Sequence, residues 1–160
     1  KKLPFGLYIT NSVQEEVGLR GAQMITERIN PDVAIVTDVC HDTQTPMINK
    51  IKQGDLFCGK GPVLTYGPAV QNNLLNLIIE TANKNKIPFQ RAAASRATGT
   101  DTDAFAYSTG GVASALISLP LRYMHTTVES VHKDDVKNVI KLIYNVLLKI
   151  KDGHDFRYIK

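Results

Sequence analysis

Two adjacent carboxylates, Glu15 and Glu16, are the residues in this sequence whose types and spacing are best suited to chemistry. They follow an apolar run at residues 3–11 and precede a turn where Gly18 and Gly21 supply backbone freedom. Side chains of neighbouring residues in extended backbone point to opposite sides, so we expect the two carboxylates to face different partners. One can then hold a metal ion while the other takes a proton from water beside it, as metal-assisted hydrolysis requires. Taken alone, such a pair is more typical of a solvated surface.

Two further polar residues follow apolar runs and can join this pair. Asp38 lies at the end of the run 33–39, and His125 comes shortly after the run 112–119. Nearly continuous apolar runs of this kind are typical of strands that are buried on both faces. Since functional polar residues in such sheets lie at strand ends, where loops form a crevice, we expect a joint site. Its candidate bases and ligands are Glu15, Glu16, Asp38 and His125.

The elements that must position these residues alternate between strands and helices. This alternation indicates an α/β fold in three layers (α/β/α), with a mostly parallel or mixed central sheet. The apolar spacing predicts strands at residues 3–11, 33–39, 89–94 and 112–119, with a short apolar run at 63–66. It predicts helices at residues 21–29, 70–85, 104–107 and 134–151, and a polar, irregular loop at 41–55.

Composition narrows the functional classes. The chain has 160 residues, 43% of them hydrophobic, which is ordinary for one soluble domain. No apolar run approaches the roughly 20 residues that a membrane helix needs, so we expect no membrane partner. The net charge of +4 comes from lysines scattered along helical segments, which argues against a nucleic-acid partner. Cys40 and Cys58 lack metal-finger and CxxC spacing, so we expect two free thiols in a cytoplasmic protein.

Several motifs together resemble one known family. In chain order they are VQEEVGLRGA at residues 13–22, Asp38 in its apolar run, GKGP at 59–62, GTD at 99–101 and LPLRYMHTTVE at 119–129. This order is similar to that of the tetrahedral-assembly (TET) or FrvX-like family of metallo-aminopeptidases, from about residue 7 to residue 149. The resemblance implies an aminopeptidase-like fold and an enzyme that removes N-terminal residues from peptide substrates.

The resemblance also implies a role for each candidate residue. Glu15 would be the general base that takes a proton from the water bridging two divalent metal ions, zinc or cobalt. Glu16 and His125 would ligate one ion, and Asp38 would ligate the other. Carboxylate and imidazole ligands suit zinc, and two ions roughly 3.5 to 4 Å apart would polarise the scissile carbonyl. Asp101 would either orient a ligand or the substrate amine, or cap the short helix that follows.

Further ligands of this family are not found in the sequence. The resemblance implies a histidine and a metal-bridging aspartate ahead of the Glu-Glu motif, and an inserted β-rich domain used in assembly. We therefore expect residues 1–160 to be the C-terminal portion of a catalytic domain, with an upstream catalytic segment and the inserted domain absent. Because a catalytic zinc takes about three protein ligands, we expect this chain alone to bind metal weakly and to hydrolyse little. The complete enzyme would form a homo-oligomer.

Two other functions stay open. One is a non-catalytic α/β fragment that associates with a partner chain, because missing strands would leave unpaired sheet edges and apolar surface. The other is a related two-metal amidase or carboxypeptidase, which substrate profiling would distinguish. His41 and Asp42 are candidate substitute ligands, although a solvated loop is the simpler interpretation of that segment.

Overall fold

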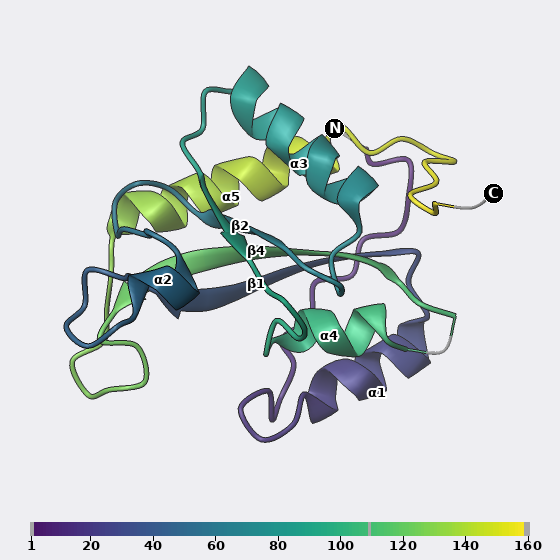
Figure 1. The fold of residues 1–160 in the computed structure, drawn as a ribbon. Helices are drawn as coiled ribbons and strands as arrows, with labels where there is room; N and C mark the ends of the chain where they lie inside the picture. Colours follow the sequence, from purple (N-terminus) through teal and green to yellow (C-terminus); the bar gives the residue numbers. More distant parts are fainter. Residues whose placement is uncertain (1, 109, 159–160) are drawn as a thin grey trace.

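The computed structural model describes residues 2–108 and 110–158, which form five helices and five strands (Figure 1). Except at their ends, these elements confirm the predicted helices and the predicted strands at 33–39, 89–94 and 112–119. Within the described ranges, no helix is both long and apolar enough to span a membrane. The helices are α1 (Arg20–Ile29), α2 (Lys50–Gln53), α3 (Asn72–Lys84), α4 (Asp101–Ala106) and α5 (Lys133–Leu147). The strands are β1 (Val33–His41), β2 (Val63–Tyr66), β3 (Gln90–Ala93), β4 (Ala113–Arg122) and β5 (Ser130–Val131).

One mixed sheet forms the middle of the fold, in the strand order β1-β4-β2-β3. β1 runs parallel to β4, and β2 runs parallel to β3, whereas β2 and β4 are antiparallel. β5 pairs with the end of β4 at Leu121 and Arg122. In the register of β1 and β4, Asp38 lies beside Ser118, so the strand that carries Asp38 neighbours the strand that leads to His125. The predicted mixed sheet is confirmed.

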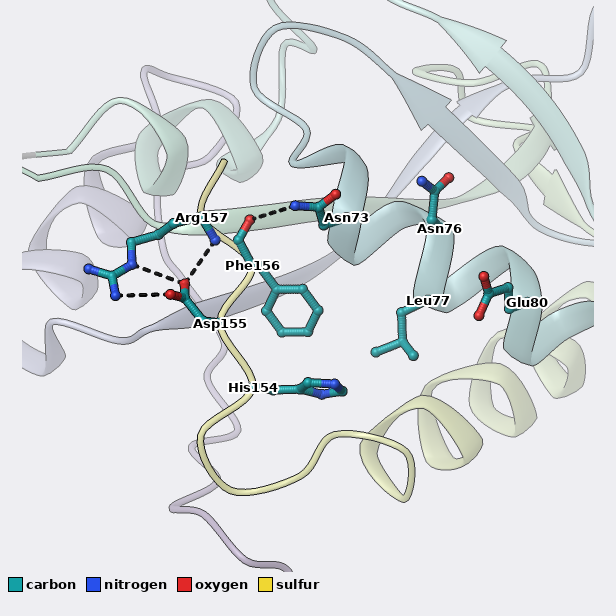
Figure 2. A pocket seen from close by; sticks show the side chains of 8 residues that line it. All are labelled: Asn73, Asn76, Leu77, Glu80, His154, Asp155, Phe156 and Arg157. Atoms are coloured by element: carbon teal, nitrogen blue, oxygen red, sulfur yellow. Dashed lines mark hydrogen bonds and ion pairs between the residues drawn. The ribbon is translucent and has the colours of Figure 1, made fainter. Parts of the chain in front are cut away.

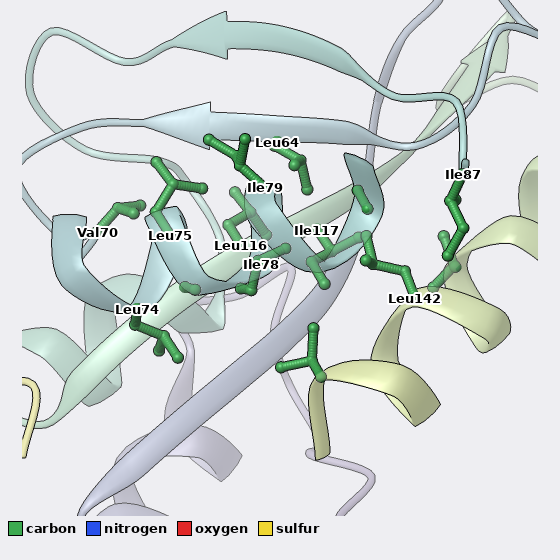
Figure 3. Packing of buried hydrophobic residues seen from close by; sticks show 14 of the residues in the cluster. Leu64, Val70, Leu74, Leu75, Ile78, Ile79, Ile87, Leu116, Ile117 and Leu142 are labelled. Atoms are coloured by element: carbon green, nitrogen blue, oxygen red, sulfur yellow. The ribbon is translucent and has the colours of Figure 1, made fainter. Parts of the chain in front are cut away.

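Helices cover both faces of the sheet: α3 and α5 lie on one face, and α1 and α4 lie on the other (Figure 1). The predicted three-layer arrangement is therefore confirmed. The larger hydrophobic core packs α3 and α5 onto the sheet, with Leu74, Ile78 and Leu142 fully buried (Figure 3). Burial of apolar surface is the main stabilising contribution to folding, so most of this stabilisation comes from the face covered by α3 and α5. The buried members of a second, smaller cluster beneath α1 and α4 are Ala22, Ala34, Phe105 and Val112.

Asp135 ties the GKGP loop to α5. Its side chain is fully buried in the first turn of α5, and its oxygens accept hydrogen bonds from the N–H groups of Gly59 at 2.6 Å and Gly61 at 2.8 Å. A Cβ at position 61 would lie 2.1 Å from the Pro88 carbonyl oxygen, so this close approach requires glycine. The GKGP motif therefore has a structural role, which is to hold the loop before β2 against α5.

The C-terminal residues return to α3 and bound a shallow pocket (Figure 2). Phe156 is buried against the core, and its carbonyl accepts a hydrogen bond from Nδ2 of Asn73 at 3.2 Å. The pocket has a volume of about 320 Å³ and is lined by residues of α3 and of the segment 154–157. None of the predicted site residues lines it.

The predicted strand at residues 3–11 is wrong. These residues pair with no strand that the structure describes, and Tyr8 and Ile9 are 69% and 91% exposed. An apolar alternation predicts a strand, but the strand forms only where a neighbouring backbone supplies its hydrogen bonds. The loop predicted at 41–55 is irregular except for α2, which begins after Asn49, whose side chain accepts hydrogen bonds from two N–H groups of α2.

Candidate metal centre

Glu15 and Glu16 occupy a tight turn, so the expectation of extended backbone at this pair is wrong. The Glu15 carbonyl accepts hydrogen bonds from the N–H groups of Gly18 at 3.1 Å and Leu19 at 3.0 Å. Both donor residues have positive φ angles, +121° and +57°, which reverse the chain before α1. The turn leaves the Glu16 side chain exposed and the Glu15 side chain half-buried. The two carboxylates thus differ in environment, although not through strand alternation.

A closed neck holds this turn, and residues 13–21 are called the glutamate loop below. The Gly21 N–H donates to the Val13 carbonyl at 2.9 Å. A Cβ at position 21 would lie 2.4 Å from the Val13 nitrogen, which no side chain tolerates. Gly21 lies inside α1 and has no positive φ, so it allows this close approach and does not provide the expected backbone freedom. The neck fixes where the glutamate loop begins and ends.

Asp38 and His125 come to the same region from β1 and from the loop after β4. Asp38 lies within β1 and is half-buried, and its Oδ1 accepts a hydrogen bond from the Val39 N–H at 2.7 Å. His125 has a φ of +62°, and its N–H donates to Oε2 of Glu129 at 2.8 Å. The backbone at His125 is therefore held in a sparsely populated conformation.

The structure brings Glu16 and His125 into direct contact. The distance from Glu16 Oε1 to His125 Nε2 is 3.2 Å, and the two side chains are 72% and 60% exposed. A carboxylate and an imidazole that converge in this way present two donor atoms to one point beside them. At this exposure, the pair adds little to folding stability.

Negative charge accumulates around Glu15 and Asp38. Burial raises the pKa of Glu15 above its ordinary value, and the neighbouring charges of Asp38 and Glu16 raise it further. Burial also raises the pKa of Asp38 against one opposing backbone hydrogen bond, and the charges of Asp101 and Glu16 add to the increase. His125 acts in the opposite direction on the pKa of both carboxyls. These side chains therefore crowd one region, and a cation there would relieve their repulsion.

Asp101 does not cap α4, so the capping alternative is wrong. The N-cap is Thr100, whose hydroxyl accepts from the Thr102 N–H at 3.2 Å. Asp101 is instead joined to the segment before the glutamate loop, because Ser12 Oγ donates to Asp101 Oδ2. Sequence reasoning missed Ser12, since the two residues are 89 positions apart and no local spacing connects them.

Asp42, a candidate substitute ligand, and the two cysteines lie in environments that differ from those expected of metal ligands or nucleophiles. Asp42 is 3% exposed and accepts hydrogen bonds from the N–H groups of Gln44 at 2.7 Å and Cys58 at 3.1 Å, so it does not lie in a solvated loop. Cys40 and Cys58 are free thiols, as expected. Burial raises the pKa of Cys40 to about 12 and that of Cys58 to about 11, so both stay protonated at neutral pH. The raised pKa of each thiol therefore disfavours a thiolate nucleophile at either position.

The model of the M42 glutamyl aminopeptidase family matches residues 1–142. The chain belongs to the M42 family. A lysyl aminopeptidase from Pyrococcus furiosus is 41% identical to this M42 chain over 145 residues, which cover 91% of the chain and 41% of that relative. The resemblance to FrvX-like and TET aminopeptidases is thus confirmed.

Solved M42 structures share the fold. A TET aminopeptidase from the marine sediment archaeon Thaumarchaeota archaeon SCGC AB-539-E09 superposes with a TM-score of 0.80 at 32% identity, over 88% of this chain and 40% of that one. The TET1 peptidase of Pyrococcus horikoshii, described as assembling into a tetrahedron or a large octahedral shell, gives 0.69 at 28% identity, over 87% and 40%. The M42 chain therefore spans about two fifths of the length of these relatives.

The donor atoms of this M42 chain fit a divalent cation in kind. Glu16 and His125 supply the carboxylate and imidazole that zinc accepts, and the carboxylates crowded beside them favour positive charge. Residues 2–108 and 110–158 nevertheless assemble no group of three side chains that could hold a metal ion. The fit is therefore a pair of ligands and not a full set.

Proposed function

We propose that this chain is the C-terminal part of the catalytic domain of a metal-dependent aminopeptidase, which hydrolyses N-terminal residues from peptides. The observation that carries this proposal is the convergence of Glu16 and His125 at 3.2 Å beside Glu15. Membership of the M42 family and the aminopeptidase names of its relatives support the same activity. The matched names differ between lysyl and glutamyl aminopeptidases, so they do not select a preferred residue.

Each site residue has a proposed task. Glu16 and His125 would hold one divalent cation, zinc or cobalt, and Asp38 would hold a second. When bound, the cations supply Lewis acidity to the scissile carbonyl and lower the pKa of the attacking water. Glu15 takes the proton at its carboxylate and passes it to the leaving amine.

The shortage of ligands supports a second part of the proposal. A catalytic zinc takes about three protein ligands, whereas Glu16 and His125 are two, and in the described part of the chain neither Asp38 nor another residue completes a group of three with them. We infer that the rest of a longer protein supplies the missing ligands, since this chain spans 41% of the lysyl aminopeptidase.

We also propose that the complete enzyme assembles as a homo-oligomer, as the TET1 peptidase does. We place its activity in the cytoplasm.

The experiment that tests the activity is Glu15→Gln in the whole protein that contains this chain. We expect kcat for lysyl- and glutamyl-p-nitroanilide to fall about 10²- to 10⁴-fold, because the amide cannot take the proton. The bound metal, measured by atomic emission, should stay at the wild-type level because Glu15 is not a proposed ligand. Glu27→Gln, on the exposed surface of α1, is the matched control and should leave kcat unchanged.

Three outcomes would overturn the proposal in different ways. A kcat within threefold of wild type for Glu15→Gln would remove Glu15 from the reaction. Turnover by the isolated 160-residue chain, with metal retained after dialysis, would show that the ligand set is complete without further segments. Equal hydrolysis of N-acetylated substrates would replace the aminopeptidase with an amidase or carboxypeptidase.

A further inference from the structure

One buried carboxylate beside the candidate metal centre is incompletely bonded. Asp101 is 9% exposed, and its Oδ1 is the single buried side-chain oxygen or nitrogen without a hydrogen-bond partner among the described residues. Asp103, two positions along α4, is equally buried, but its oxygens accept from the N–H groups of Thr98 at 3.1 Å and Gly99 at 2.9 Å. Asp103 therefore stabilises the start of α4, whereas the bonding of Asp101 serves no helix end.

The bonded oxygen of Asp101 reaches the base of the glutamate loop. Ser12 Oγ donates to Asp101 Oδ2, and Ser12 directly precedes Val13, whose carbonyl closes the neck with Gly21. Through Gly21, the neck joins the end of the glutamate loop to α1, which packs against α4. The hydrogen bond from Ser12 to Asp101 adds a restraint at the start of the loop, because it joins this end to α4, which contacts β1 and β4 directly.

We propose that Asp101 is a positioning residue, which acts through Ser12 to hold the glutamate loop, and with it Glu15 and Glu16, against α4. The unbonded Oδ1 is a cost at this position, because no group in the described part of the chain donates to it. A buried oxygen near Glu15 and Asp38 that receives no hydrogen bond costs free energy. Native structures keep such unbonded polar groups mainly at functional sites. The role in catalysis rests on the proposed function, whereas the restraint on the loop does not.

The restraint is tested by amide hydrogen exchange on the chain without metal. The N–H groups of Gly18, Leu19 and Gly21 report on the glutamate loop, because each donates within it. We expect Ser12→Ala to raise their exchange rates at least tenfold. Asp101→Asn should keep these rates within threefold of wild type, since an amide oxygen still accepts from Ser12.

Internal references separate this effect from general loss of stability. The Gly61 N–H, which donates to Asp135 on the other side of the sheet, should exchange as in wild type. Ser108→Ala is the matched control, because its hydroxyl also bonds to α4, at the Phe105 carbonyl, but does not touch the glutamate loop. Unchanged exchange at Gly18 and Leu19 in Ser12→Ala, or an equal increase at Gly61, would overturn the proposal.

The consequence for catalysis is tested in the whole protein. We expect Ser12→Ala to lower kcat at least tenfold with KM unchanged, because Glu15 is displaced while the substrate contacts remain. Ser12→Thr keeps a hydroxyl donor and should restore most of the activity. If exchange responds as expected but the wild-type protein is no peptidase, the proposed function fails and the positioning role stands. If exchange does not respond, the positioning role fails whatever the activity.

Discussion

Two buried carboxylates on opposite faces of the sheet, Asp135 and Asp101, differ in how their oxygens are bonded. On the α3/α5 face, Asp135 is fully buried and both its oxygens accept backbone N–H groups. On the α1/α4 face, Asp101 is nearly as buried, yet one of its oxygens has no partner within the described part of the chain. A buried acceptor without a donor costs about 1–3 kcal/mol, so the second arrangement opposes folding. Asp135 thus stabilises the α3/α5 face, whereas Asp101 leaves a cost on the α1/α4 face.

The largest loss of stability is expected for Ile78→Ala on the α3/α5 face. Ile78 is fully buried in the larger core, and deleting its side chain leaves a cavity in a closely packed region. We expect the free energy of unfolding, measured by urea denaturation, to fall by about 4 kcal/mol. Ile140→Ala is the control, since Ile140 lies on α5 but is 64% exposed, and should change the value by less than about 0.5 kcal/mol.

Asp135→Ala should lower the free energy of unfolding somewhat less than Ile78→Ala does. It leaves the N–H groups of Gly59 and Gly61 without their acceptor, and we expect a loss of about 3 kcal/mol in the free energy of unfolding. The adjacent Asp134→Ala also removes a carboxylate from the first turn of α5, but Asp134 is exposed and should cost about 0.5 kcal/mol. Equal losses in both variants would mean that the helix end, and not the hydrogen bonds to the glycines, accounts for the effect.

Asp38→Asn, in contrast, should raise the free energy of unfolding at pH 7. Because the pKa of Asp38 is raised on folding, the folded state binds its proton more tightly, and stability falls as the pH rises through that range. The neutral amide avoids this loss, so at pH 7 we expect a gain below about 1 kcal/mol in thermal or urea unfolding. The gain should vanish below about pH 3.9, where Asp38 is protonated in both states. Destabilisation at pH 7 would mean that the Asp38 charge is paired.

The pair of Glu16 and His125 should contribute least to folding. Both side chains are more than half exposed, so a double-mutant cycle with Glu16→Gln and His125→Asn should give a coupling below about 0.5 kcal/mol. Asparagine is chosen because it tolerates the positive φ at position 125. A coupling above about 2 kcal/mol would mean that this exposed pair stabilises the fold, as the buried contacts on the α3/α5 face do.

The sequence predicted the elements whose pattern is local. The helical spacing of Val136, Val139 and Ile143 in α5, and the continuous apolar run of β1, each carry their own evidence, and both elements form as expected except at their ends. Residues 3–11 carry the same kind of pattern, but no described strand lies beside them to pair with. Local patterning predicts which segments are able to form strands, and the neighbours decide which ones do.

The candidate site was predicted as a set of residues and not as a geometry. The approach of Glu16 and His125 depends on the parallel pairing of β1 with β4 and on two turns of positive φ, none of which follows from spacing. The bond from Ser12 to Asp101 was missed for the same reason. The metal-binding and catalytic roles of Glu15, Glu16, Asp38 and His125 stay predictions until metal content and turnover are measured.

The neck between Val13 and Gly21 has a consequence for how this protein can evolve. Since a Cβ at position 21 would overlap the Val13 backbone, a substitution there opens the loop, whatever the new side chain is. Residues at the exposed tip, such as Val17, meet no comparable constraint. Residues at the tip of the loop, such as Val17, can therefore be substituted while the loop keeps its length and direction.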